Sequence, residues 1–184
     1  LLAALSVSGR LGGPTGAQAL VRRALQWRVS PRWYAIALGL PLLMIVPAVG
    51  TARMLGLAPV APRWPPSVWR LVGVFLFHLL TLATAEFGWR GVALPLARRR
   101  HPAEQASYVV GAASALWALP YIVGLYQGQA GYGSLSLHIV GWTIYLLGAS
   151  VIQTWLYNST SSLWVCMLYA ACSMSIWTVA TGVM

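Results

Sequence analysis

The sequence has very few acidic residues and no lysine. All twelve basic residues are arginine, and the two acids are Glu86 and Glu104. Residues 105–184 contain no Asp, Glu, Lys or Arg, and charged residues make up 8% of the chain. Since a soluble domain carries about 25% charged residues, this scarcity excludes an ordinary soluble fold, whose water-facing surface could not be built from such a composition.

Cysteine is also scarce. The two cysteines, Cys166 and Cys172, lie six positions apart in one apolar run. On a helix this spacing points the two side chains in different directions. We therefore expect two free thiols in a packed interior rather than a disulfide or a metal site.

Long apolar runs make up most of the chain, and 59% of its residues are hydrophobic. A membrane-spanning helix needs about 20 mostly apolar residues. The sequence therefore predicts an all-α polytopic transmembrane helical bundle, one membrane-embedded domain over residues 1–184 that lacks a preceding segment. The expected spans are residues 33–51, 68–87, 107–126, 137–156 and 162–180. Turn-forming residues predict loops at residues 58–66, 127–134 and 157–161.

Residues 19–29, ALVRRALQWRV, combine an apolar face with a basic one. Val21 and Leu25 lie on the apolar side of a helical projection, and Arg22 and Arg23 on the basic side. This pattern predicts an N-terminal amphipathic helix that rests on the membrane surface.

The arginines indicate how the chain is oriented. One cluster precedes the first span (Arg22, Arg23, Arg28 and Arg32) and another follows the second span (Arg98, Arg99 and Arg100). Both lie at the same end of the bundle if each run crosses once, and the positive-inside rule places that end in the cytoplasm. The net charge of +10 thus indicates a lipid bilayer as partner and no nucleic acid, because the arginines flank apolar runs. Arginine in place of lysine suggests a GC-rich coding sequence, so we expect a bacterial cell membrane.

Ionisable residues inside the spans need a reason, because each costs at least about 2.5 kcal/mol at the bilayer centre. Glu86 lies near the end of the second span, and Arg90 lies four residues further along the same helix face, so the two side chains can pair. His78 and His138 lie in the second and fourth spans. We expect interhelical hydrogen bonds for these histidines, with metal binding as the alternative.

Four segments resemble the CPBP intramembrane metalloprotease family, the CAAX-protease and bacteriocin-processing (Abi-like) group. AEFGWRGVALP (85–95) is similar to its EExxxR motif, and WALPYIVG (117–124) to its WHLP motif. QTWLYNSTSSLWVCMLYAACSMS (153–175) resembles its third motif, in which TWLYN precedes a helix that reads HAAxN. The opening, RRALQWRVSPRWYAIALGLP (22–41), resembles its basic entry into a span.

The resemblance implies a polar cavity among the spans, where a glutamate activates water, histidines hold a zinc ion and an asparagine stabilises the oxyanion. The motif glutamate falls on Ala85, while the second glutamate and the arginine are kept as Glu86 and Arg90. The histidine of the second motif falls on Ala118, or on Tyr121 in a shifted alignment. The third-motif histidine and asparagine fall on Tyr169 and Ser173.

These substitutions remove the groups that carry the chemistry. Alanine supplies no donor atom, a tyrosine phenol stays protonated near neutral pH, and a catalytic zinc typically needs three protein ligands. We therefore expect a catalytically impaired homologue, with no cofactor, that binds a hydrophobic peptide or a membrane-protein partner. One alternative is a divergent active endopeptidase that holds zinc with Glu86, His78 or His138. Another is a transporter-like or lipid-binding bundle.

Overall fold

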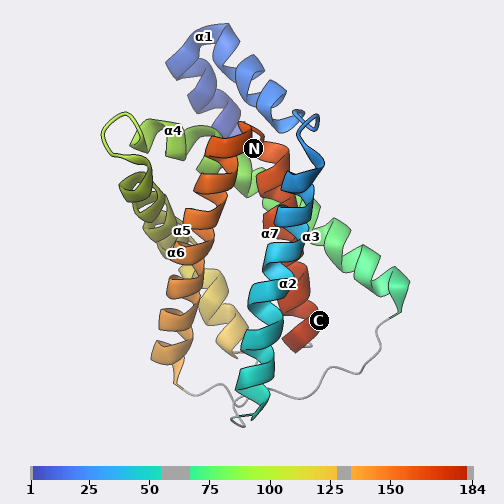
Figure 1. The fold of residues 1–184 in the computed structure, drawn as a ribbon. Coiled ribbons are helices and arrows are strands. Elements are labelled where there is room, and N and C mark those ends of the chain that lie inside the picture. Colours follow the sequence, from blue (N-terminus) through green and yellow to red (C-terminus); the bar gives the residue numbers. More distant parts are fainter. Residues whose placement is uncertain (1, 55–66, 128–133, 182–184) are drawn as a thin grey trace.

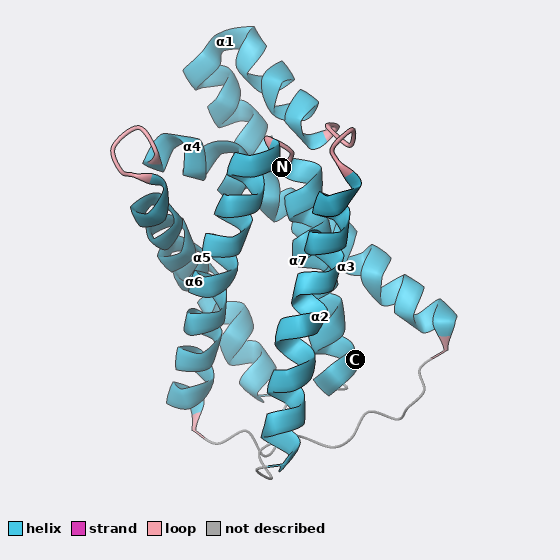
Figure 2. Cartoon of the chain, viewed as in Figure 1, coloured by secondary structure: helices cyan, strands magenta, loops and turns pink. Residues whose placement is uncertain are grey.

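The chain folds into a bundle of helices. The computed structural model describes residues 2–54, 67–127 and 134–181, and within these ranges it contains seven α-helices, one π-helical segment and no strand (Figure 2). The α-helices are α1 (Leu2–Ala24), α2 (Pro31–Met54), α3 (Val68–Gly88), α4 (Leu94–Ala97), α5 (Ala103–Gln127), α6 (Leu135–Thr160) and α7 (Leu163–Thr181); the π-helical segment η1 is Trp89–Ala93. The all-α prediction is confirmed.

Five stretches are long and apolar enough to cross a bilayer, as the sequence predicted. They are Pro31–Thr51, Val68–Ala97, Ala103–Gly124, Leu135–Thr160 and Leu163–Ala180. The second of these runs without interruption from α3 through η1 to α4. The chain is therefore an integral membrane protein.

The predicted loop at residues 157–161 is wrong over most of its length. Helix α6 continues through Thr160, whose hydroxyl donates to the Leu156 carbonyl oxygen at 2.7 Å. The reversal occurs at Ser161, which adopts a left-handed conformation with φ of 54°. The predicted loop at 58–66 lies outside the described residues. Of the loop at 127–134, the described part comprises Gln127, which ends α5, and Ser134, which caps the N-terminus of α6.

The amphipathic segment at 19–29 is helical only as far as Ala24, so its predicted end is wrong. Tertiary contacts hold the residues that follow in a non-helical path with tight turns. The Gln26 side chain donates to the Thr160 carbonyl oxygen at 3.2 Å, and the Ser162 hydroxyl donates to the Gln26 carbonyl oxygen at 2.5 Å. These bonds give the Gln26 side chain and carbonyl oxygen partners outside a helix and tie the segment between α1 and α2 to the α6–α7 turn.

Helix α1 bends back on itself above the bundle (Figure 1). The Ser8 hydroxyl donates to the Gly16 carbonyl oxygen at 2.8 Å across the bend. The sequence has a proline between Ser8 and Gly16, and proline cannot donate the backbone hydrogen bond that would keep a helix straight. The bend brings Ala4 and Leu20 into one apolar cluster with Leu163 of α7.

Helix α7 lies at the centre, with α2 and α3 packed against it, while α5 packs against α6. The close approach of α5 and α6 depends on Gly111, where an added Cβ would lie 3.0 Å from the Cβ of Ser150. Ser150 also donates to the Ser107 carbonyl oxygen at 2.8 Å. The result is one group of helices, α2, α3 and α7, beside the pair α5 and α6, with α6 in contact with α7.

Both arginine clusters lie at the same end of the bundle, as predicted. Arg23 of α1 donates to the Tyr157 hydroxyl at 3.1 Å, and Arg98 after α4 donates to the Asn158 side-chain oxygen at 2.7 Å. Tyr157 and Asn158 are neighbours in the last turn of α6. The two guanidinium groups therefore lie at the negative end of the α6 dipole, where cations are stabilising.

Candidate functional site

A cavity of about 150 Å³ lies between α3, η1, α5, α6 and α7. A cavity of this volume is large enough for a benzene-sized group or a few water molecules. Its walls are mostly apolar and aromatic, with a small number of polar side chains at one end. The lining residues that matter for the argument are Ala85, Glu86, Arg90, Ala118, Gln153 and Tyr169.

The positions that the family resemblance singled out converge in space. Ala85, Glu86, Arg90, Ala118 and Tyr169 all line this cavity, although they come from four different elements. Ser173 lies one helical turn beyond Tyr169, is 1% exposed, and places its hydroxyl beside those of Tyr145 and Tyr169.

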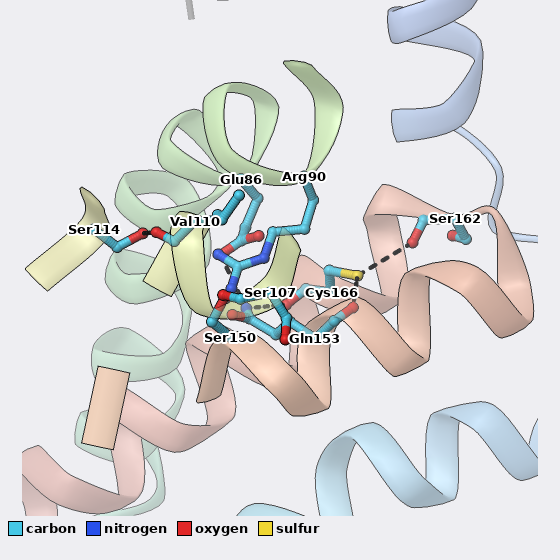
Figure 3. Close-up of polar contacts among 9 residues, drawn as sticks. All are labelled: Glu86, Arg90, Ser107, Val110, Ser114, Ser150, Gln153, Ser162 and Cys166. Atoms are coloured by element: carbon cyan, nitrogen blue, oxygen red, sulfur yellow. Dashed lines mark hydrogen bonds and ion pairs between the residues drawn. The ribbon is translucent and has the colours of Figure 1, made fainter. Parts of the chain in front are cut away.

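An ion pair occupies the polar end of the cavity. The Arg90 Nη1 atom lies 3.3 Å from Glu86 Oε1, and each residue is only 4% exposed. Gln153 of α6 donates from Nε2 to the same Glu86 oxygen at 2.9 Å and to the Cys166 carbonyl oxygen at 3.4 Å. Figure 3 shows Glu86 and Arg90 on one continuous helix and Gln153 on another, with the three side chains pointing toward one another. The Gln153 amide therefore links α6 to Glu86 of α3 and to the backbone of α7.

The π-helical segment sets the direction of these side chains. Its wider turn follows directly after Gly88, and it buries both Arg90 and Gly91. Arg90 faces the cavity, whereas Gly91 faces α1, where an added Cβ would lie 2.4 Å from Leu20 Cδ1. Such π-helical turns are frequent at functional sites; here the turn serves both the ion pair and the docking of α1.

Several buried polar atoms of the described residues have no hydrogen-bond partner. They include Glu86 Oε2, Arg90 Nε and Thr154 Oγ1. Glu86 and Arg90 line the cavity, so one acceptor and one donor are available at its polar end. Leaving such groups unsatisfied costs about 1–3 kcal/mol each. The cavity is therefore suited to hold water or a ligand group that both donates and accepts.

Two tryptophans form part of the cavity wall. Trp89 of η1 and Trp117 of α5 lie edge to face, with ring centroids 6.1 Å apart. Trp117 is 69% exposed and Tyr121, one turn further along α5, is 56% exposed. Because Trp117 and Tyr121 belong to a spanning segment, this part of the cavity wall has large apolar side chains exposed on the side of α5.

The two histidines considered as alternative ligands lie elsewhere. The His78 Nδ1 atom lies 3.3 Å from the Ser175 hydroxyl oxygen, and the His138 ring packs near Tyr126 and Trp142. Neither histidine is among the described residues that line the cavity. The expected interhelical contact is found for His78, which joins α3 to α7.

The donor set does not fit the zinc ion that the family resemblance implies. No group of three or more His, Cys, Asp or Glu side chains converges anywhere in residues 2–54, 67–127 and 134–181. In the cavity, Ala85 and Ala118 offer no donor atom, and Glu86 already holds Arg90 and Gln153. A catalytic zinc site typically needs three protein ligands and an open position.

The sequence interpretation missed two features of this site. One is Gln153, an uncharged polar residue within an apolar span, where polar side chains are rare and usually have a partner; that rarity was the available signal. The other is the Trp89–Trp117 pair, because no local pattern relates two residues that meet only after folding. Cys166 is buried, Cys172 is half-buried, and both are free thiols.

The comparisons with known proteins bear on the same region. The family model described as "Type II CAAX prenyl endopeptidase Rce1-like" matches residues 66–173. This stretch covers more than half of the 184-residue chain and includes Glu86, Arg90, Ala118 and Tyr169. No curated protein and no solved structure matches the chain.

Proposed function

Since the chain belongs to the Rce1-like family of type II CAAX prenyl endopeptidases, we propose that it is a member without hydrolytic activity that holds a hydrophobic membrane segment at its central cavity. One observation carries the proposal: Glu86 is the one carboxylate among the described cavity-lining residues, and it is bound to Arg90 and Gln153. A general base must reach the proton that it removes, and a carboxylate held in an ion pair is poorly placed to do so.

The cavity dimensions define what it binds. About 150 Å³ accommodates one apolar side chain rather than a whole helix. The bound segment would insert such a side chain past Trp89 and Trp117, and a peptide group beside it would donate to Glu86 Oε2 and accept from Arg90 Nε. Exposed backbone is tolerated at membrane depth only where protein satisfies it, so these two atoms favour a segment whose helix is locally broken.

The arginine-rich end would face the cytoplasm. The Arg23–Tyr157 and Arg98–Asn158 contacts place both clusters on one side, and loops rich in arginine remain on the cytoplasmic side during insertion. Cysteine labelling of the α4–α5 turn from each side of oriented vesicles tests this orientation.

Binding is tested with a leucine-rich single-span peptide that carries a central Gly-Pro pair and a fluorophore, reconstituted with the protein in nanodiscs. The Ala118→Trp substitution fills the cavity and should abolish binding. Its control is Ala112→Trp on the exposed side of α5, which should leave binding intact. Intact peptide after long incubation, with binding that depends on an unfilled cavity, supports the proposal; shortened peptide refutes it.

A second candidate is a divergent active endopeptidase, which is favoured by the unpartnered Glu86 Oε2 atom. Glu86 lines the cavity, whose volume of about 150 Å³ is large enough for a water molecule. The candidate predicts cleavage of the same peptide by the unmutated protein and loss of cleavage in Glu86→Gln.

A further inference from the structure

An open groove of about 830 Å³ lies at the surface where α1 ends, well away from the central cavity. It is formed by the last turns of α1 and the non-helical residues that follow, from Ala17 to Arg28. Its floor contains Val21, Leu25 and Trp27, and its two cationic residues are Arg22 and Arg28. An apolar floor with cations beside it is suited to a ligand that has both an apolar chain and an anionic group.

The apolar floor is unusually exposed for a helix that packs on a bundle. Leu25 is 70% exposed and Trp27 is 61% exposed. On the side of α1 opposite the groove, Leu20 and Ala24 are buried and pack against α7. The groove side of α1 is thus a second apolar face that the described part of the chain does not cover.

The two arginines of the groove, Arg22 and Arg28, are exposed, whereas the arginine between them in sequence is not. Arg23 lies between them in sequence but turns inward and donates to the Tyr157 hydroxyl. Arg22 and Arg28 remain exposed, and the Arg28 guanidinium lies 5.2 Å from the centroid of the Trp27 ring. The first acidic residue of the chain is Glu86, so no carboxylate of the N-terminal region neutralises this groove.

The position of the groove in the chain places it near the lipid headgroups. The first span begins at Pro31, only a few residues after Trp27 and Arg28. The groove therefore lies at headgroup level, where tryptophan and arginine are typical. A second copy of this chain is a poor occupant, because its two acids are Glu86, buried in an ion pair, and Glu104 in the first turn of α5.

We propose that this groove binds one anionic glycerophospholipid, with the phosphate between Arg22 and Arg28 and the upper part of an acyl chain along Val21, Leu25 and Trp27. Arginine is suited to the phosphate because its planar fork can donate two hydrogen bonds. The bound lipid fills the space between α1 and the start of α2. This inference does not depend on whether the protein cleaves peptides.

The test uses the purified full chain and native mass spectrometry from detergent, with phosphatidylglycerol and phosphatidylcholine added in competition. The unmutated protein should retain phosphatidylglycerol in preference. Arg22→Gln with Arg28→Gln should reduce that preference roughly thirtyfold. Each arginine near a membrane surface strengthens the binding of an anionic lipid by about a factor of five, and the two factors multiply. The matched control is Arg99→Gln with Arg100→Gln, which removes the same charge from the exposed α4–α5 turn and should preserve the preference.

Two further arms separate the possible explanations. Arg22→Lys with Arg28→Lys keeps the charge and should retain most of the preference, which also guards against misfolding of the glutamine variant. Excess inorganic phosphate should not displace the lipid, since a free ion lacks the acyl chain. Equal losses in the groove and control variants, displacement by phosphate alone, or no preference in the unmutated protein would each overturn the proposal.

Discussion

Gln153 of α6 donates a hydrogen bond to Glu86 of α3, with 2.9 Å between Nε2 and Oε1. The same oxygen accepts from Arg90, so a single carboxylate atom joins a cation on its own helix to an amide on another. Both contacts lie where water has almost no access. They fix the Glu86 side chain against the cavity wall and compensate for burying a carboxylate within a spanning segment.

Removing the cation should destabilise the fold. Arg90→Gln leaves the Glu86 carboxylate buried without its counter-charge, and breaking one side of a buried pair costs about 3–5 kcal/mol. We expect a clear fall in the unfolding midpoint measured in detergent. The double variant Glu86→Gln with Arg90→Gln should recover much of the loss. A double variant as unstable as the single one would contradict the assigned pairing.

Removing the amide should have a smaller effect. Gln153→Leu deletes the hydrogen bond to Glu86 while keeping the side-chain volume, and a buried bond to a charged group contributes about 1.5–3 kcal/mol. The control is Gln105→Leu, at an exposed position in the first turns of α5. Comparable unfolding midpoints for the two variants would show that Gln153 does not support Glu86.

The docking of α1 depends on a glycine. Gly91→Ala places a Cβ 2.4 Å from Leu20 Cδ1, and Leu20 is only 2% exposed, so it has little room to move. Overpacking of this kind costs about 1–3 kcal/mol and should loosen α1. Limited trypsin digestion at the α1 arginines should then become faster.

A neighbouring glycine provides the control for that measurement. An added Cβ at Gly88 meets nothing within 4 Å. Gly88→Ala should therefore leave digestion of α1 unchanged, although it lies just before the same π-helical turn. Equal acceleration in both variants would locate the effect in the turn rather than in the contact with Leu20.

The converging motif positions predict that the chemistry can be restored. Ala85→Glu, Ala118→His, Tyr169→His and Ser173→Asn together should give about one bound zinc ion per chain, because three of them supply ligands of the types that zinc prefers. Zinc content by elemental analysis is the first measurement, and peptide cleavage is the second. A stable quadruple variant without zinc would show that these positions do not converge closely enough.

The spans could be predicted because each depends on local composition alone. About 20 apolar residues in a row identify a spanning helix whatever it packs against, and the arginine clusters at Arg22 and Arg98 identified the shared end. The motif resemblance also predicted which side chains meet in the cavity, since Ala85, Ala118 and Tyr169 all line it.

The remaining features depend on contacts between distant parts of the chain. The helical pattern at 19–29 stops at Ala24 because Gln26 bonds to the α6–α7 turn. Turn-forming residues at 157–160 stay helical because arginines from α1 and after α4 bind Tyr157 and Asn158. No periodicity in a single segment carries such information.

The most direct test of the account measures metal and cleavage in the same sample. The unmutated protein is purified in the presence of zinc, its metal content is determined, and it is incubated with the Gly-Pro peptide in nanodiscs. The account predicts zinc far below one ion per chain and no shortened peptide detectable by mass spectrometry. Stoichiometric zinc together with cleavage that disappears in Glu86→Gln would contradict it.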